Sequence, residues 1–203
     1  WFGEEVVNYT ISDGKGGSAN GTLTVTVNSV NDLPVYTTNP ADMVLTEDED
    51  PGVSTFVVGD VETAASLLAV TVDEISNTTL VGEEDITIEA GTDGNRTITV
   101  DPKLNQNGSA QITLLVTDAD GGTATVTFTV TVSAVNDAPT AADATRNIDE
   151  DTALLTIQKS AVSGDVDFAT NGDTYSLSIT TQAQHGFAGI DENGNLTYVP
   201  TKD

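Results

Sequence analysis

Cysteine is absent from this chain of 203 residues, which excludes disulfide bonds and thiolate metal sites. Basic residues are scarce: six Lys and Arg stand against 32 Asp and Glu, a formal net charge of −26. Nucleic acids and anionic membranes attract surfaces rich in Lys and Arg, so we expect neither as a partner. No apolar run approaches the ~20 residues of a membrane helix, and we recognise no signal peptide. We therefore expect no membrane insertion.

Catalytic residue types are also few. The single histidine, His185, stands in Gln184-His185-Gly186, which is typical of a turn. There is no Cys, and no Ser occupies a nucleophile-elbow setting. Paired carboxylates could serve a glycosidase, but aromatic residues that would stack on sugar make up only 5% of the chain. We expect no enzyme and no catalytic residue.

The chain contains a pentapeptide twice. Val30-Asn31-Asp32-Leu33-Pro34 recurs as Val135-Asn136-Asp137-Ala138-Pro139, and Asn31 and Asn136 are 105 residues apart. Each copy follows an Asp, a Gly pair and a run that alternates Thr with Val or Leu. This period fits a small independent domain. It predicts the end of one unit over 1–33, a complete unit over 34–138 and the start of a third over 139–203.

Runs with a period of two dominate the sequence and predict β-strands. Thr and Val are β-branched and suit a pleated, half-buried strand, whereas no segment predicts a helix. The expected fold is all-β, as tandem Greek-key sandwiches. In the complete unit we expect strands at about 36–46, 53–58, 67–74, 85–90, 96–100, 110–117 and 123–133, and in the third unit the alternating run Tyr175 to Ile179 reads as a strand.

Successive antiparallel strands alternate in direction, so this order sorts the acidic clusters between the two ends of the unit. Asp60-Val61-Glu62 and Asp118-Ala119-Asp120 fall at the upstream end, beside Asn31-Asp32. Glu47-Asp48-Glu49-Asp50 and Asp101 fall at the downstream end, beside Asn136-Asp137. Asp165-Val166-Asp167 then faces the same junction from the third unit.

Carboxylates converging at each junction would repel one another strongly. A hard divalent cation resolves this cost, and calcium takes roughly six to eight oxygen ligands. A solvated surface or an adaptation to salty water is the alternative explanation of the charge.

These motifs resemble a known family. The phrase Asp-Gly-x-Gly-Gly, the alternating strand and Val-Asn-Asp-x-Pro, with Asp149-Glu150-Asp151-Thr152 and Asn193-Gly194-Asn195-Leu196-Thr197-Tyr198-Val199-Pro200, resemble cadherin-like tandem repeats of very large bacterial surface adhesins, including the RTX type. The resemblance covers essentially the whole chain. It implies cadherin-like or immunoglobulin-like sandwiches with Ca²⁺ at the junctions.

Carried over by position, the resemblance implies two sets of calcium ligands. The first junction would use Asn31, Asp32, Asp60, Glu62, Asp118 or Asp120, and the second Glu49, Asn136, Asp137, Asp165 and Asp167 with Asp101; Asp13 would serve the upstream end of the first unit. The first unit has Lys15 at the position equivalent to Asp120, and the third unit has Asp167 at the position equivalent to Glu62. Equal affinity at the two junctions is therefore not expected.

The two ends of the sequence match each other. Pro102 to Gly108 spans six steps in the complete unit, and Pro200 to Asp203 followed by Trp1 to Gly3 spans the same number. One explanation is a longer chain of near-identical two-domain repeats. The other is head-to-tail assembly of separate copies by strand complementation.

The function expected from the resemblance is a calcium-rigidified extender of an extracellular bacterial adhesin or filament at the cell surface. It would project a distal binding region, with neighbouring repeats or copies of itself as partners. The alternative is a direct binding module for a cell-surface glycan or protein, for which the long segment Asn77 to Asp85 is the candidate loop.

Overall fold

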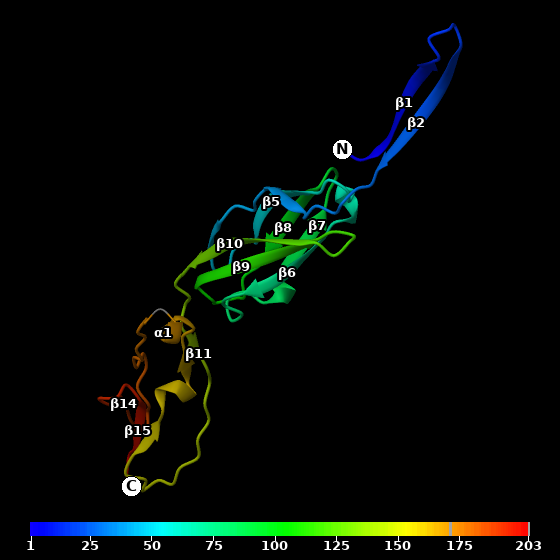
Figure 1. Cartoon of the computed structure of the whole chain (residues 1–203). Coiled ribbons are helices and arrows are strands. Elements are labelled where there is room, and N and C mark those ends of the chain that lie inside the picture. Colours follow the sequence, from blue (N-terminus) through cyan, green and yellow to red (C-terminus); the bar gives the residue numbers. More distant parts are fainter. Residues whose placement is uncertain (171, 203) are drawn as a thin grey trace.

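The structure, a computed structural model, describes residues 1–170 and 172–202. It is elongated, with a free hairpin, a β-sandwich and a smaller third unit following one another (Figure 1). No helix in the described part of the chain has the length and hydropathy needed to cross a bilayer.

The free hairpin consists of β1 (Gly3–Ser12) and β2 (Ser18–Val27). The strands pair antiparallel over their full length, from Gly3 opposite Val27 to Ser12 opposite Ser18. Its base lies next to the sandwich and its turn points away from it (Figure 1). Almost every hairpin residue is exposed, because no second sheet covers either face.

The sandwich occupies the middle of the chain and contains two four-stranded sheets, confirming the all-β expectation. One sheet has the order β3-β5-β8-β7 and the other β4-β10-β9-β6. The strands are β3 (Val35–Thr38), β4 (Met43–Thr46), β5 (Gly52–Gly59), β6 (Ala69–Ile75), β7 (Ile86–Ala90), β8 (Asn95–Val100), β9 (Gly108–Thr117) and β10 (Thr123–Ser133). Short 3₁₀ turns lie at Ala65–Leu67 and Glu83–Asp85.

The expected first strand over 36–46 is divided in two. Buried Pro40 interrupts it, because proline has no N–H to donate to a ladder. The strand then changes sheets: β3 pairs antiparallel with β5, whereas β4 pairs parallel with β10. The chain thus links both sheets at one edge.

The core lies between the two sheets. The inner residues of β9 alternate strictly, so Ile112, Leu114 and Val116 are fully buried, and Phe56 and Ile98 face them. Among the described residues, the buried hydrophobic core cluster extends from Met43 to Val132. Only the middle unit therefore has a closed core.

The third unit is an open half of the same fold. It contains β11 (Thr140–Ala141), β12 (Leu155–Ile157), a 3₁₀ turn (Lys159–Ala161), β13 (Ser163–Gly164), the one-turn helix α1 (Asp167–Thr170), β14 (Gly186–Ile190) and β15 (Leu196–Pro200). β12, β15 and β14 form one sheet, and β11 pairs with β13.

The strand expected over Tyr175 to Ile179 is wrong for this structure, in which these residues form no ladder. Their counterpart in the middle unit, β6, pairs with β9. The described residues of the third unit contain no counterpart of β9. A strand without a neighbour has no partner for its hydrogen bonds.

Candidate cation sites at the two junctions

Linker residues contact the sandwich at the first junction. Asn31 Nδ2 donates a hydrogen bond of 3.0 Å to Asp118 Oδ2, and the backbone N–H of Asp32 donates one of 3.0 Å to Glu62 Oε2. Asp118 is buried and lies at the start of the turn between β9 and β10. The hydrogen bond from Asn31, followed by those from backbone N–H groups of its own turn, lowers the pKa of Asp118. This carboxylate is therefore held ionised.

Asp60 completes this cluster from the turn that follows β5. Its Oδ1 accepts the backbone N–H groups of Glu62 at 2.9 Å and Thr63 at 2.6 Å. Its Oδ2 is buried and has no hydrogen-bond partner. Among the described residues, no Lys or Arg forms an ion pair with these carboxylates. A buried carboxylate oxygen without a partner is costly and fits a cation ligand.

The second junction repeats two of these backbone contacts. The backbone N–H of Asp137 donates a hydrogen bond of 2.5 Å to Asp167 Oδ2, as Asp32 does to Glu62. The backbone N–H of Asp167 donates one of 3.0 Å to Asp165 Oδ1, as Glu62 does to Asp60. Asp137 Oδ2 is buried without a hydrogen-bond partner. Both linkers thus enter the following unit in the same way.

Carboxylates from both units surround Asp137. Desolvation by burial raises the pKa of Asp137, and the charges of Asp48, Asp167, Glu47 and Asp165 raise it further. This repulsion is the situation that a bound divalent cation relieves.

The second junction also contains a group of three carboxylates within one unit. Single ligand oxygens of Asp165, Asp167 and Asp173 all lie within 4.8 Å of one another, and Asp167 is buried. This spacing suits an ion that each carboxylate contacts with one oxygen.

Glu47 joins the sandwich to the second linker. It is 2% exposed, its Oε1 accepts the backbone N–H of Val135 at 2.7 Å, and its Oε2 accepts Asn107 Nδ2 at 3.4 Å. The resemblance implied Glu49 instead, which is exposed and makes none of these contacts. Met43 and Leu45 lie on the inner face of β4, and Glu47, just after the strand ends at Thr46, continues this alternation inward. The positive φ of Asp48, 62°, then takes Glu49 out of this register.

Several other predicted residues lie outside the two clusters. Asp120 and Asp101 are exposed; the backbone N–H of Asp120 donates to Asp118 Oδ1, and that of Asp101 to the Asp85 carbonyl. Asn136 is exposed and its Nδ2 donates to its neighbour's carbonyl, that of Asp137, at 3.0 Å. Asp13 lies in the turn of the free hairpin, between the end of β1 at Ser12 and the start of β2 at Ser18. Asp173 was missed because it stands in no repeated motif. Asp48 was placed at this end of the unit, in the acidic run over 47–50, but was not chosen as a ligand.

The segment from Asn77 to Asp85 serves the core instead of forming an exposed loop. Leu80 and Val81 are fully buried, and Lys103 Nζ donates to the Thr78 carbonyl at 3.0 Å and pairs with Glu84 at 3.2 Å. Its length is thus explained by packing.

Comparison with known proteins agrees with this architecture. The family described as "Bacterial Ig domain" matches residues 31–131 and 136–203. No curated protein sequence matches the chain significantly.

Solved cadherin ectodomains share the fold at low identity. Human desmocollin-1 aligns with a TM-score of 0.56 and 13% identity over 98% of this chain and 40% of that one. The extracellular cadherin domains 1–5 of protocadherin gamma B2 align with a TM-score of 0.54 and 15% identity over 99% of this chain and 40% of that one. The chain thus spans well under half the length of either ectodomain. An endo-fucoidan hydrolase of glycoside hydrolase family 107 aligns at a TM-score of 0.41 with 16% identity, over 98% of this chain and 30% of that one, too distant to bear on catalysis.

Proposed function

Because this chain belongs to the bacterial Ig domain family, we propose that it is a calcium-rigidified extender of an extracellular bacterial adhesin or surface filament, of the RTX type that its motifs resemble. Bacterial Ig domains are usually extracellular surface modules, and this use requires no catalysis. The observation that carries the proposal is the repeated junction: each junction contains a buried carboxylate oxygen that no hydrogen bond satisfies, Asp60 Oδ2 in the turn after β5 at the first and Asp137 Oδ2 in the linker at the second.

The residues at both junctions fit calcium. They offer carboxylate, amide and backbone oxygens without a competing thiolate or imidazole, and calcium prefers such oxygen ligands. At the first junction Asn31, Asp32, Asp60, Glu62 and Asp118 would hold the ion. At the second Glu47, Asp137, Asp165, Asp167 and Asp173 would hold it, contributed by the sandwich, the linker and the third unit.

Cation binding would change the stiffness of the chain. Without it, like charges across the second junction repel, and the linker acts as a short hinge. With it, groups from both units are tied to one centre. Binding also stabilises the folded state, because the unfolded chain has no preformed site. Extracellular calcium modules bind at roughly 0.1 to 1 mM, so the rod would stiffen after export.

Small-angle scattering in millimolar calcium and in chelator tests the proposal. We expect the longest dimension of the chain to increase and its distribution to narrow when calcium is added. Asp137→Ala should reduce this response, while each folded unit stays intact at high calcium. Asp73→Ala is the matched control, because Asp73 is an exposed carboxylate within β6, away from both linkers.

Identical scattering in calcium and in chelator would contradict the proposal. Unchanged calcium affinity of Asp137→Ala in isothermal titration would contradict the role assigned to that residue. Unfolding of this variant at high calcium would assign Asp137 to fold stability instead.

A further inference from the structure

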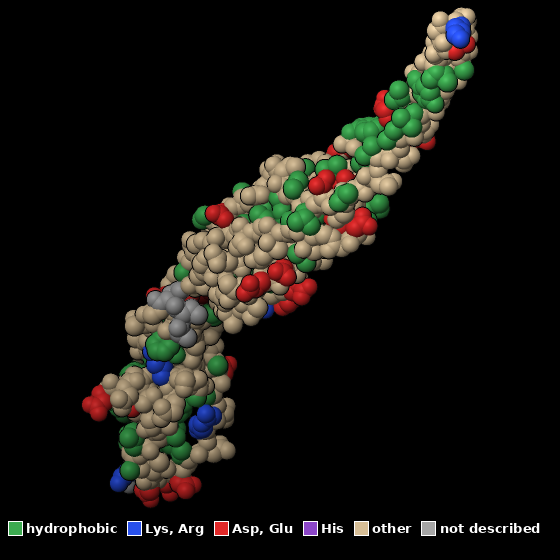
Figure 2. Space-filling model, viewed as in Figure 1, with side chains coloured by type: hydrophobic (Ala, Val, Ile, Leu, Met, Phe, Trp, Pro, Cys, Tyr) green, Lys and Arg blue, Asp and Glu red, His purple; other side chains and the backbone are tan. Residues whose placement is uncertain are grey.

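The free hairpin carries an apolar face that nothing covers. Val7, Tyr9 and Leu23 are 47%, 50% and 53% exposed, and Val7 lies directly opposite Leu23 in the ladder. Figure 2 shows hydrophobic side chains along the length of the hairpin. The other face is polar: the Thr22 hydroxyl donates to Asn8 Oδ1, and that of Thr10 to Asn20 Oδ1. The hairpin thus has one face built for a core and one for water.

The middle unit shows what this face does when it is covered. Val7, Tyr9 and Leu23 correspond, 105 residues on, to Ile112, Leu114 and Phe128, which are 0%, 0% and 2% exposed. The register is the same, since Ile112 lies opposite Phe128. In the middle unit the equivalent hairpin, β9 and β10, packs on the sheet that contains β5 and β8 and so closes the core.

The third unit presents the complementary open sheet. Leu155 and Leu196 lie opposite Tyr198 and Ile157 in its ladder, which places all four side chains on one face. They are half-buried. Tyr198 corresponds to Ile98 of the middle unit, which is fully buried. This sheet therefore leaves partly exposed a set of side chains whose counterpart in the middle unit is buried in the core.

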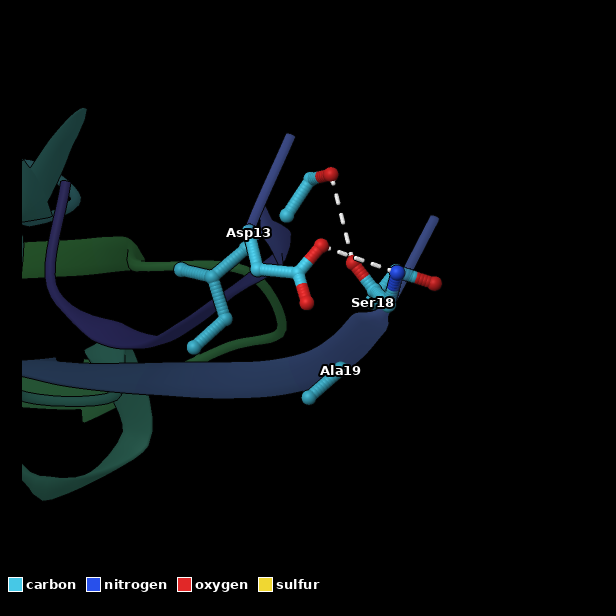
Figure 3. A pocket seen from close by; sticks show the side chains of 6 residues that line it. Asp13, Ser18 and Ala19 are labelled. Atoms are coloured by element: carbon cyan, nitrogen blue, oxygen red, sulfur yellow. Dashed lines mark hydrogen bonds between the residues drawn. The ribbon is translucent and has the colours of Figure 1, made fainter. Parts of the chain in front are cut away.

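The turn of the hairpin also matches. Asp13 Oδ1 accepts the backbone N–H groups of Lys15 at 2.8 Å and Gly17 at 2.9 Å, as Asp118 Oδ1 accepts those of Asp120 at 2.9 Å and Gly122 at 2.7 Å. Figure 3 shows Asp13 facing the strand that begins at Ser18. Asp13 thus has the conformation that lets Asp118 meet Asn31.

The second junction lacks this one contact. Asn31 donates to Asp118 at the first junction, whereas Asn136 donates to the neighbouring Asp137 carbonyl. The other repeated contacts, Asp32 with Glu62 and Asp137 with Asp167, are common to both junctions. The missing partner of Asn136 is a carboxylate on a hairpin turn.

We propose that the β1–β2 hairpin of one copy docks on the open β12-β15-β14 face of a second copy, where its Asp13 completes the second junction beside Asn136, Asp165 and Asp167. The docked hairpin restores the sandwich, and repetition of the contact produces a head-to-tail series. The calcium dependence of this contact rests on the proposed function.

Charge makes the contact depend on a cation. The chain carries a net charge of −26, so two copies repel each other over a Debye length of about 8 Å at physiological salt. Docking also brings the Asp13 carboxylate to a junction where Asp137 is already crowded by other acidic groups. A divalent cation shared by these groups offsets that repulsion.

Analytical ultracentrifugation of the full chain over a range of concentrations in millimolar calcium tests the proposal. We expect species at multiples of 21.0 kDa that dissociate in chelator. Val7→Asp should leave the chain monomeric. Val6→Asp is the matched control and should assemble normally, because exposed Val6 lies opposite Thr24 on the polar face.

Mixing two variants distinguishes head-to-tail docking from hairpin-to-hairpin docking. Tyr198→Asp damages the acceptor face and Val7→Asp the donor face, so each alone should stay monomeric. Their mixture should form a 1:1 dimer, since one intact donor meets one intact acceptor even where Tyr198→Asp disorders its own third unit. Dimers of Tyr198→Asp alone would overturn the proposal.

Hydrogen exchange gives an independent readout. In the assembly, the segment Tyr175 to Ile179 gains β1 as a neighbour, as β6 has β9. Its amides should become protected as concentration rises in calcium, and the same segment should exchange freely in Val7→Asp. Protection that does not change with assembly would overturn the proposed docking mode.

The failures of the two proposals are distinguishable. Wild-type chain that binds calcium but stays monomeric at every concentration overturns this inference alone. A monomeric Val7→Asp variant that binds no calcium overturns the proposed function. Assembly that is equally strong in chelator, or in Asp13→Ala, overturns the shared site at the second junction.

Discussion

Asn31 and Asp118 are 87 residues apart in sequence, yet the Nδ2 of Asn31 donates a hydrogen bond of 3.0 Å to the Oδ2 of Asp118. The contact ties the first linker to the turn between the two longest strands of the sandwich. It lowers the pKa of that carboxyl more than any single backbone donor of the turn does. The entrance to the sandwich is thus fixed by a side-chain pair even without a cation.

Replacing Asn31 with Leu should raise the pKa of Asp118 toward its usual value, because the largest stabiliser of the charged form is lost. Carboxyl-carbon NMR titration of the cation-free chain measures this. Asn20→Leu is the control, since Asn20 accepts a hydrogen bond on the exposed hairpin face far from Asp118. An unchanged titration of Asp118 would mean that the backbone donors alone hold its charge.

The two junctions should respond to pH in opposite directions in the absence of calcium. The pKa of Asp137 is raised by burial and neighbouring carboxylates, so the folded chain binds this proton more readily than the unfolded chain. The contribution of Asp137 to the free energy of unfolding therefore rises as pH falls through the carboxyl range. The lowered pKa of Asp118 gives a contribution that is lost as pH falls.

Asp137→Asn separates these contributions. In chelator near neutral pH the variant should be more stable than wild type, because it removes a desolvated and repelled charge. In millimolar calcium it should be less stable, because it weakens cation binding. Thermal unfolding in both buffers measures the crossover. The same sign of change in both would contradict a ligand role for Asp137.

Glu47→Gln should weaken calcium binding at the second junction, whereas Glu49→Gln should leave it unchanged. Glu47 is buried against the linker and accepts the N–H of Val135, while Glu49 is exposed. Isothermal titration of the two variants compares a carboxylate inside the cluster with one two residues away. Equal losses would indicate that only the overall charge of this loop matters.

Leu114→Ala should lower the free energy of unfolding of the sandwich by about 2–5 kcal/mol, the usual cost of emptying a packed aliphatic site. Tyr9→Ala, at the corresponding position of the free hairpin, should change it by less than about 0.5 kcal/mol in dilute, calcium-free solution. Denaturant titration measures both. A large effect of Tyr9→Ala under these conditions would show that the hairpin already packs on the sandwich of its own chain.

The sequence predicted most strands because the middle unit alternates so regularly. The alternation from Thr123 to Val132 predicts a strand with one apolar face, and the observed strand β10 spans the same residues. The break at Pro40 and the unpaired segment Tyr175 to Ile179 were not predicted. A local pattern reports which residues suit a strand, but the presence of a neighbouring strand is a property of the whole fold.

The candidate site was predictable to a similar degree. The repeated motif identified the linkers and the Asp-x-Asp or Asp-x-Glu turns, because both junctions contain them. Asp173 stands in no repeat, and Glu47 was distinguished from Glu49 only by the direction of its side chain. Positions within an acidic loop have the same composition, so the backbone conformation at Asp48, where φ is 62°, decides which carboxylate turns inward.

The parallel pairing of β4 with β10 has a mechanical consequence. The upstream linker leads through β3 into β4, and the downstream linker leaves from β10. The ladder of β4 and β10 runs from Met43 opposite Val130 to Thr46 opposite Ser133. Tension applied through the two linkers pulls these neighbouring strands in opposite directions along their axes. The ladder is therefore loaded in shear, and its hydrogen bonds must yield together instead of opening one after another. A pulled chain of such sandwiches would stretch at its linkers before its sandwiches unravel.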